Sequence, residues 1–289
     1  MASLRQILQQ THHTLESYDI PDARLEAEVA LMNVLQIPRQ AIFSQQESEV
    51  TPQQEASLNE IIQRREQREP LAYILGYREF YGINLFVNTD VLIPRPETES
   101  LVEHTLFMAL MGMESAELVI ADIGTGTGAI AINLGIHMPV ARIYAVDNFD
   151  SVLDVTSYNV RTHNVSDRIK LLKGDLMDPV PEPVDVIVAN LPYIPSKRIS
   201  TLQPEVQWEP IQALDGGEDG LDLIKRLLQQ ASQGSLKPHG VIILEVDPEQ
   251  VPPIQQLAAE LFPQSEVSVE KDLAQMDRMV VINLASSEN

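Results

Sequence analysis

The fold is decided by residues 118–129, which read LVIADIGTGTGA. An apolar run of strand-forming residues leads into a loop that has glycine at every second position. Glycine lets the backbone approach a ligand closely, and the helix after such a loop presents free N–H groups and the positive end of its dipole. The stretch therefore predicts a strand, a cofactor-binding turn and a helix. Its candidate cofactor-binding residues are Asp122, Gly124, Thr125, Gly126, Thr127 and Gly128.

Apolar runs continue to alternate with helical stretches, such as 221–233, toward the C-terminus. The predicted strands are 118–123, 142–147, 168–173, 184–190, 240–246, 265–270 and 279–284. This alternation is typical of an α/β fold with an open, mostly parallel sheet and helices on both faces. Ligands of such sheets bind beyond the carboxyl ends of the strands, so we expect the chemistry there.

Residues 1–75 have helical periodicity and are predicted to form a small helical domain. The apolar positions of its first two helices are Leu4, Ile7, Leu8 and Leu15, then Leu25, Val29, Met32 and Leu35. Residues 51–54, TPQQ, predict a third helix through a capping hydroxyl, a first-turn proline and a glutamine three residues on. Residues 76–98 are predicted to form a connector with a β-hairpin, and residues 99–289 the α/β domain.

Composition excludes several classes of function. The 289 residues include 42 acidic and 20 basic side chains, a net charge of −22, which repels phosphate backbones and anionic lipid. With no cysteine there is no disulfide, zinc–thiolate site or thiol nucleophile. The N-terminus is polar, and no apolar stretch approaches the roughly 18 residues of a membrane span. We expect a soluble, cytoplasmic monomer without nucleic-acid, membrane or metal partners.

An acidic residue ends the second predicted strand, and another follows the third predicted strand. Asp147 could accept hydrogen bonds from both ribose hydroxyls of either NAD or S-adenosylmethionine. Asp175 could accept from an adenine amino group, with Leu176 against the ring. The spacing of Gly124, Gly126 and the following Ala129 also fits a loose dinucleotide pattern, so these residues leave the two cofactors open.

The turn Asn190-Leu191-Pro192-Tyr193 after the fourth strand favours S-adenosylmethionine. The Asn190 side-chain oxygen and the Leu191 carbonyl could accept the two N–H bonds of an –NH2 group, while Tyr193 packs against its plane. Pro192 stiffens the turn. These four residues are the candidate catalytic residues, and the pattern predicts methyl transfer to an amide or amino nitrogen.

Longer motifs resemble one family. They are EPLAYILG at 69–76, EFYG at 79–82, LIPRPETE at 92–99, the glycine loop, the 190–193 turn, EP at 209–210, AL at 213–214 and DGL at 219–221. With these motifs the chain resembles the HemK/PrmC family of S-adenosylmethionine-dependent methyltransferases, which modify a glutamine side-chain amide of peptide-chain release factors. The resemblance implies a seven-stranded Rossmann-like sheet with a reversed final hairpin, behind a helical substrate-recognition domain.

The resemblance also implies roles for particular residues. The cofactor would contact 124–128, Asp147, the Asp175-Leu176 pair and Asn190, and the glutamine of the Gly-Gly-Gln motif of class-1 release factors would lie on the 190–193 turn. Arg95 and Glu97 could be catalytic, but we favour an interpretation of the two as an interdomain latch beside the cofactor. The chain departs from the family's usual pattern at Leu191, where proline is usual, and at 245–247 and 275–278.

Other functions stay open at this point. They are methylation of a glutamine in a ribosomal protein, methylation of an amino group of a nucleic-acid base, NAD-dependent oxidoreduction and nucleotide binding without catalysis. The net charge of −22 weighs against the nucleic-acid substrate.

Overall fold

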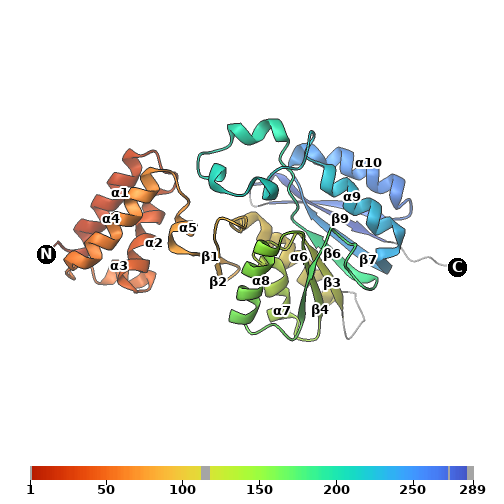
Figure 1. The fold of residues 1–289 in the computed structure, drawn as a ribbon, viewed down its shortest axis with the longest axis horizontal. Coiled ribbons are helices and arrows are strands. Elements are labelled where there is room, and N and C mark those ends of the chain that lie inside the picture. The colour runs from red at the N-terminus through yellow and green to blue at the C-terminus, as the bar shows by residue number, and fades with distance from the viewer. Residues whose placement is uncertain (1, 112–117, 273, 285–289) are drawn as a thin grey trace. The chain divides into compact units, whose positions relative to one another are not determined.

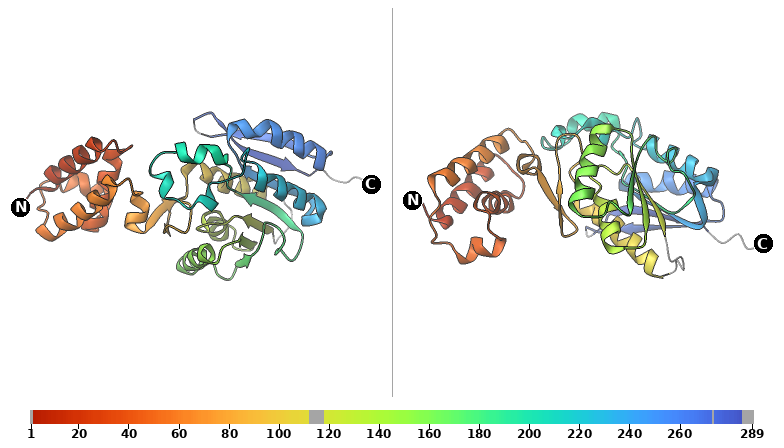
Figure 2. Two further views of the ribbon diagram at one scale, coloured as in Figure 1. Left: turned by 45° about the horizontal axis from the view of Figure 1, so that its top comes forward. Right: turned by 60° about the horizontal axis from the view of Figure 1, so that its bottom comes forward.

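The computed structural model describes residues 2–111, 118–272 and 274–284. Its chain divides into two compact units, drawn as ribbons in Figures 1 and 2. The first unit comprises residues 1–77 and 203–208, and the second comprises 78–202 and 209–289. The helical unit therefore includes a short segment from much later in the chain.

The helical unit is built from α1 (Leu4–Ser17), α2 (Ala23–Leu35), α3 (Arg39–Ser44), α4 (Pro52–Glu66) and α5 (Leu71–Leu75). The capping box predicted at the start of the third helix is confirmed, since the Thr51 side chain accepts the Gln54 N–H and the Gln54 side chain accepts the Thr51 N–H. The predicted apolar face of α2 is wrong in part. Leu25 is 48% exposed, and α2 buries its small Ala27 and Ala30 instead, which allows close helix packing.

A buried arginine joins the late segment to the helices. Arg65 on α4 is 1% exposed and donates to Glu26 on α2 at 2.6 Å and to Glu205 at 3.2 Å. Arg68 also donates to Glu205, at 2.8 Å. Hydrogen bonds from the two arginines lower the pKa of the Glu205 carboxyl. A short helical turn, η3 (Val206–Trp208), follows this residue.

The second unit opens with the predicted hairpin, β1 (Tyr77–Phe80) and β2 (Ile83–Phe86), followed by the turn η1 (Pro96–Thr98). Its main sheet has seven strands in the order β5-β4-β3-β6-β7-β9-β8. The bounds are β3 (Val119–Ile123), β4 (Arg142–Asp147), β5 (Ile169–Lys173), β6 (Val184–Ala189), β7 (Leu236–Glu245), β8 (Glu266–Lys271) and β9 (Asp277–Asn283). Strands β3 to β7 run parallel, whereas β9 is antiparallel to β7 and β8. The predicted fold class and reversed final hairpin are confirmed.

Helices cover both faces of the sheet (Figure 1). One face carries α6 (Glu99–Met111), α7 (Ala129–His137) and α8 (Asp150–Thr162), and the other carries α9 (Asp222–Gln230) and α10 (Val251–Leu261). Alternate residues of β3 serve the two cores: Ile120 packs toward α7, and Ala121 and Ile123 pack on the opposite side. The remaining short turns are η2 (Ser196–Thr201), η4 (Ile211–Ala213), η5 (Ala231–Ser235) and η6 (Pro248–Gln250).

Within the described residues, no helix combines the length and the apolar character that crossing a bilayer requires.

Candidate active site

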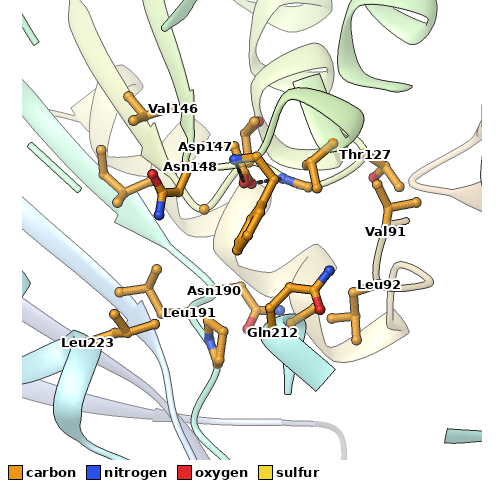
Figure 3. A pocket seen from close by; sticks show the side chains of 18 of the residues that line it. Val91, Leu92, Thr127, Val146, Asp147, Asn148, Asn190, Leu191, Gln212 and Leu223 are labelled. Carbon is orange, nitrogen blue, oxygen red and sulfur yellow. Dashed lines mark hydrogen bonds between the residues drawn. The ribbon is translucent and has the colours of Figure 1, made fainter. Parts of the chain in front are cut away.

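A cavity of about 360 Å³ opens at the carboxyl ends of the parallel strands, within the second unit (Figure 3). Its size is in the range of about 300–1,000 Å³ that small-molecule sites occupy. The predicted site residues that line it are Gly124, Thr125, Gly126, Thr127, Asp147, Asp175, Leu176, Asn190, Leu191 and Pro192. Asp122, Gly128 and Tyr193 are not among its lining residues. Strand order therefore brings most of the predicted site together.

The glycine loop after β3 is fixed by backbone geometry that side chains would disturb. Gly124 has φ +73°, in the left-handed region that favours glycine, and its N–H donates to the Val146 carbonyl at 3.0 Å. A Cβ on Gly124 would lie 2.9 Å from a methyl group of Leu191. The Thr156 hydroxyl on α8 donates to the Gly126 carbonyl at 2.7 Å, which ties the loop to a neighbouring helix.

Asp122 supports the loop from beneath. It is fully buried, and its Oδ2 accepts the Thr125 hydroxyl at 2.6 Å and the Ala131 N–H at 3.1 Å. Burial raises its pKa to about 6. Its Oδ1 has no hydrogen-bond partner among the residues that the structure describes. The buried carboxyl therefore holds the loop and the first turn of α7 in place through two hydrogen bonds.

Asp147 lies at the end of β4 and lines the cavity, as predicted. Its Oδ2 accepts the Gly126 N–H at 3.2 Å and its Oδ1 accepts the Phe149 N–H at 3.3 Å. Burial raises the pKa of this carboxyl, and the backbone N–H bonds lower it in part. Each carboxylate oxygen has further lone pairs, so Asp147 can also accept from a ligand. In Figure 3 Asp147 and Asn148 lie across the cavity from Asn190.

Asp175 already has a strong partner. Its carboxylate forms an ion pair with Arg226 on α9, and both residues line the cavity. Nothing in the sequence around Arg226 predicts this contact. The predicted hydrogen bond from an adenine amino group to Asp175 would therefore be made to a carboxylate that is neutralised from one side.

The turn after β6 presents one end of an amide to the cavity. Asn190 Nδ2 donates to the Thr98 hydroxyl at 3.0 Å, whereas no hydrogen bond within the described residues involves Asn190 Oδ1. Leu191 is 4% exposed, and its side chain packs into the core beside Gly124. The side chain that replaces the family's proline thus has a packing role that the sequence does not reveal.

Tyr193 is directed toward a buried carboxylate. Its hydroxyl donates to Glu245 Oε1 at 3.3 Å, and its carbonyl accepts the Gln250 side chain at 2.8 Å. Burial and the nearby Glu245 charge raise the pKa of the Tyr193 hydroxyl. The Thr98 hydroxyl donates to the other oxygen of Glu245 at 2.6 Å. Burial raises the pKa of Glu245, while the two donated hydroxyls lower it.

Arg95 does not join the two units. It forms an ion pair with Glu209, which also accepts the Ile93 N–H at 3.3 Å, and all three residues belong to the second unit. The pair holds the segment before η1, which contributes Asp90, Val91, Leu92 and Pro94 to the cavity wall. Glu97 is exposed. The predicted interdomain latch is therefore a contact between two segments of one unit.

Six residues that line the cavity were not predicted as site residues from the sequence: Thr98, Asn148, Phe149, Gln212, Leu223 and Arg226. Thr98 lies inside the 92–99 motif, which could have suggested it; the others belong to no motif recognised here. The described part of the chain contains no cluster of histidine and acidic residues able to hold a metal ion.

Comparison with known proteins agrees with this geometry. Residues 104–272 match the methyltransferase small domain, and residues 6–76 match the PrmC N-terminal domain. Among solved structures, the hMettl16 catalytic domain superposes with a TM-score of 0.59 at 17% identity, covering 72% of this chain and 77% of that one. A methyltransferase from Pyrococcus furiosus gives 0.52 at 16% identity, covering 71% and 90%. The fold and the matched domain define a methyltransferase.

Two curated relatives show to which family of methyltransferases the chain belongs. Release factor glutamine methyltransferase of Moorella thermoacetica is 38% identical, covering 96% of this chain and 96% of its own. The protein of the same name from Bacillus cereus is 35% identical, covering 88% and 90%. The chain belongs to the release factor glutamine methyltransferase family.

Proposed function

We propose that the chain transfers a methyl group from S-adenosylmethionine to the side-chain amide nitrogen, N5, of the glutamine in the Gly-Gly-Gln motif of class-1 release factors. The observation that carries the proposal is the free side-chain oxygen of Asn190, which has no hydrogen-bond partner within the described residues. This oxygen lies at the cavity into which the glycine loop and Asp147 project. An acceptor at that place suits a substrate that brings an N–H group.

The residues around the cavity fit the cofactor. The glycine loop leaves room for a ligand against the backbone, and Asp147 can accept from ribose hydroxyls. Asp122 does not line the cavity, and it would act by holding Thr125 and the first turn of α7 in place. Leu176 and Leu223 provide apolar walls for a flat ring. When bound, this cofactor supplies an electrophilic methyl group.

The chain's own residues align and activate the substrate. An amide nitrogen is a poor nucleophile because its lone pair is delocalised into the carbonyl. The Asn190 side-chain oxygen and the Leu191 carbonyl would accept its two N–H bonds, which orients the nitrogen and stabilises the positive charge that gathers on it. Alignment can contribute several kcal/mol, and fixed acceptors add electrostatic stabilisation. No general base is assigned, because the nitrogen becomes acidic once it carries the methyl group and can then lose its proton.

The charge of the chain, as well as its family, supports a release factor as the protein substrate. A net charge of −22 should attract a basic protein surface and repel RNA and DNA. The exposed Gly-Gly-Gln loop, which enters ribosomal RNA, should have such a surface, and the helical unit would make a second contact with the release factor away from the glutamine. We place this reaction in the cytoplasm. Association should slow as salt rises, since peripheral charges steer the encounter.

The test uses the full-length protein with isotope-labelled S-adenosylmethionine. Intact release factor, the same factor with Glu in place of the motif glutamine, a ribosomal protein, and naked RNA or DNA are the four substrates. Mass spectrometry should map one methyl group to the motif glutamine in the first and none in the second. Efficient methylation of nucleic acid or of the ribosomal protein, with the release factor unmodified, would replace the proposal by that alternative.

A second experiment removes the proposed hydrogen-bond acceptor, the Asn190 side-chain oxygen. Asn190→Ala should leave cofactor affinity largely intact and lower turnover by about 100-fold or more, the scale for losing one preorganised group at the reacting atom. Unchanged turnover would remove Asn190 from the proposed chemistry.

A further inference from the structure

The side-chain amide of Asn190 can point either its oxygen or its –NH2 group at the cavity, and only one of these can accept a substrate N–H. The polarity is fixed by a chain of two hydrogen bonds. Asn190 Nδ2 donates to the Thr98 hydroxyl at 3.0 Å, and that hydroxyl donates to Glu245 Oε2 at 2.6 Å. Thr98 and Glu245 are 4% and 3% exposed. Water therefore has little access to either bond.

The direction of the chain follows from the donors available. In its ionised form, which the Thr98 and Tyr193 hydroxyls and the charge of Arg278 favour against burial, Glu245 accepts hydrogen bonds and donates none. A hydroxyl has a single proton. Because the Thr98 proton is given to Glu245, the Thr98 oxygen can only accept from Asn190. The –NH2 group of Asn190 is the one end that can donate, so its oxygen must face the other way.

Glu245 is itself held in place from several elements. Its second oxygen accepts the Tyr193 hydroxyl at 3.3 Å, Arg278 on β9 provides positive charge, and Glu97 in η1 opposes that charge with a negative one. One carboxylate at the end of β7 thus orients both ends of the 190–193 turn, Tyr193 directly and Asn190 through Thr98.

We propose that Thr98 and Glu245 are positioning residues that hold the Asn190 side-chain oxygen toward the substrate, so that the site selects a nitrogen carrying N–H bonds. The inference rests on the proposed function and extends it to residues outside the 190–193 turn. A glutamine –NH2 group satisfies the Asn190 oxygen, whereas the carboxylate of a glutamate would place two negative oxygens against it. The site therefore distinguishes the amide from the acid by the fixed polarity of one side chain.

The test compares Thr98→Val, which replaces the hydroxyl by a methyl group of similar size, with Thr98→Ser, which keeps the hydroxyl. Thr105→Val is the matched control: Thr105 is 0% exposed on α6, and its hydroxyl donates to the Leu101 carbonyl of its own helix, its one side-chain hydrogen bond among the residues that the structure describes. Each full-length variant is measured for kcat, for KM toward the release factor, for the Kd of S-adenosylmethionine and for the midpoint of thermal unfolding.

Thr98→Val should lower kcat by about 10- to 100-fold, the scale for a residue that orients another functional group, with a cofactor Kd close to that of the wild type. Thr98→Ser should recover most of the loss, and Thr105→Val should keep wild-type kcat. In NMR spectra of the labelled protein, hydrogen exchange of the Asn190 –NH2 group should be slow in wild type and Thr98→Ser and faster in Thr98→Val.

Three results would overturn the inference. Wild-type kcat in Thr98→Val, or rapid exchange of the Asn190 –NH2 group in the wild type, would show that the bond does not orient Asn190. Equal losses of kcat in Thr98→Val and Thr105→Val, each matched by its loss of thermal stability, would reduce Thr98 to a packing residue. A wild-type enzyme that leaves the motif glutamine unmodified would instead remove the proposed function, and the inference with it.

Discussion

The cofactor assignment is tested most directly by Asp147→Ala, which removes the carboxylate at the end of β4. The oxygens of this side chain accept N–H bonds from Gly126 and Phe149 and line the cavity where ribose hydroxyls would bind. Losing hydrogen bonds to a charged group costs about 1.5–3 kcal/mol. At 1.36 kcal/mol for each factor of ten, the Kd for S-adenosylmethionine should rise about 10- to 150-fold.

Isothermal titration calorimetry on full-length protein measures this Kd, and thermal unfolding without ligand reports any loss of fold. Asp147→Asn keeps one acceptor oxygen and should give an intermediate Kd. Asp150→Ala is the control for charge, because Asp150 at the start of α8 forms an exposed ion pair with Lys173, and such pairs contribute at most about 1 kcal/mol to stability. An unchanged Kd in Asp147→Ala, or equal weakening in Asp150→Ala, would refute the assignment.

Three other perturbations test the supporting structure. Gly124→Ala forces a Cβ to 2.9 Å from a leucine methyl group at φ +73°, so the free energy of unfolding and the free energy of cofactor binding should each be weakened by about 1–3 kcal/mol. Gly82→Ala, at φ +79° with nothing within 4 Å, should leave cofactor affinity unchanged. Burial raises the pKa of Asp122 from 3.8 to about 6, so the folded wild type keeps a proton that the unfolded chain releases, and stability from this group is lost as pH rises from about 4 to 6. Relative to Asp122→Asn, the wild-type free energy of unfolding in urea should therefore be larger at pH 4 than at pH 7, by up to about 3 kcal/mol, and a pH-independent difference would contradict this. Arg65→Met leaves Glu205 and its neighbouring carboxylates without their buried partner and should destabilise the helical unit by about 3–5 kcal/mol, seen as an earlier helical transition in circular dichroism; an unshifted transition would mean that the pair contributes nothing.

The sequence by itself determined the parts of this protein that depend on neighbouring residues. Apolar runs separated by helical stretches predicted the seven strands to within a few residues, because strands of a sheet that helices cover need apolar residues toward the core. The glycine loop and the Thr51 capping box are likewise local, since turn geometry and helix caps are set within about four residues. Asp147 and Asn190 could be placed in the site because parallel strands bring their carboxyl ends to one edge.

Only the tertiary structure decided which distant side chains meet. Thr98 and Glu245 are 147 residues apart, Asp175 and Arg226 are 51 apart, and Arg65 and Glu205 are 140 apart. No periodicity in the sequence encodes such pairs, because each depends on strand order, on register and on the path of the connecting segments. The burial of Leu191 against Gly124 and the exposure of Leu25 have the same origin. A side chain's neighbours are set by packing, whereas its own helix or strand is set largely by the residues beside it.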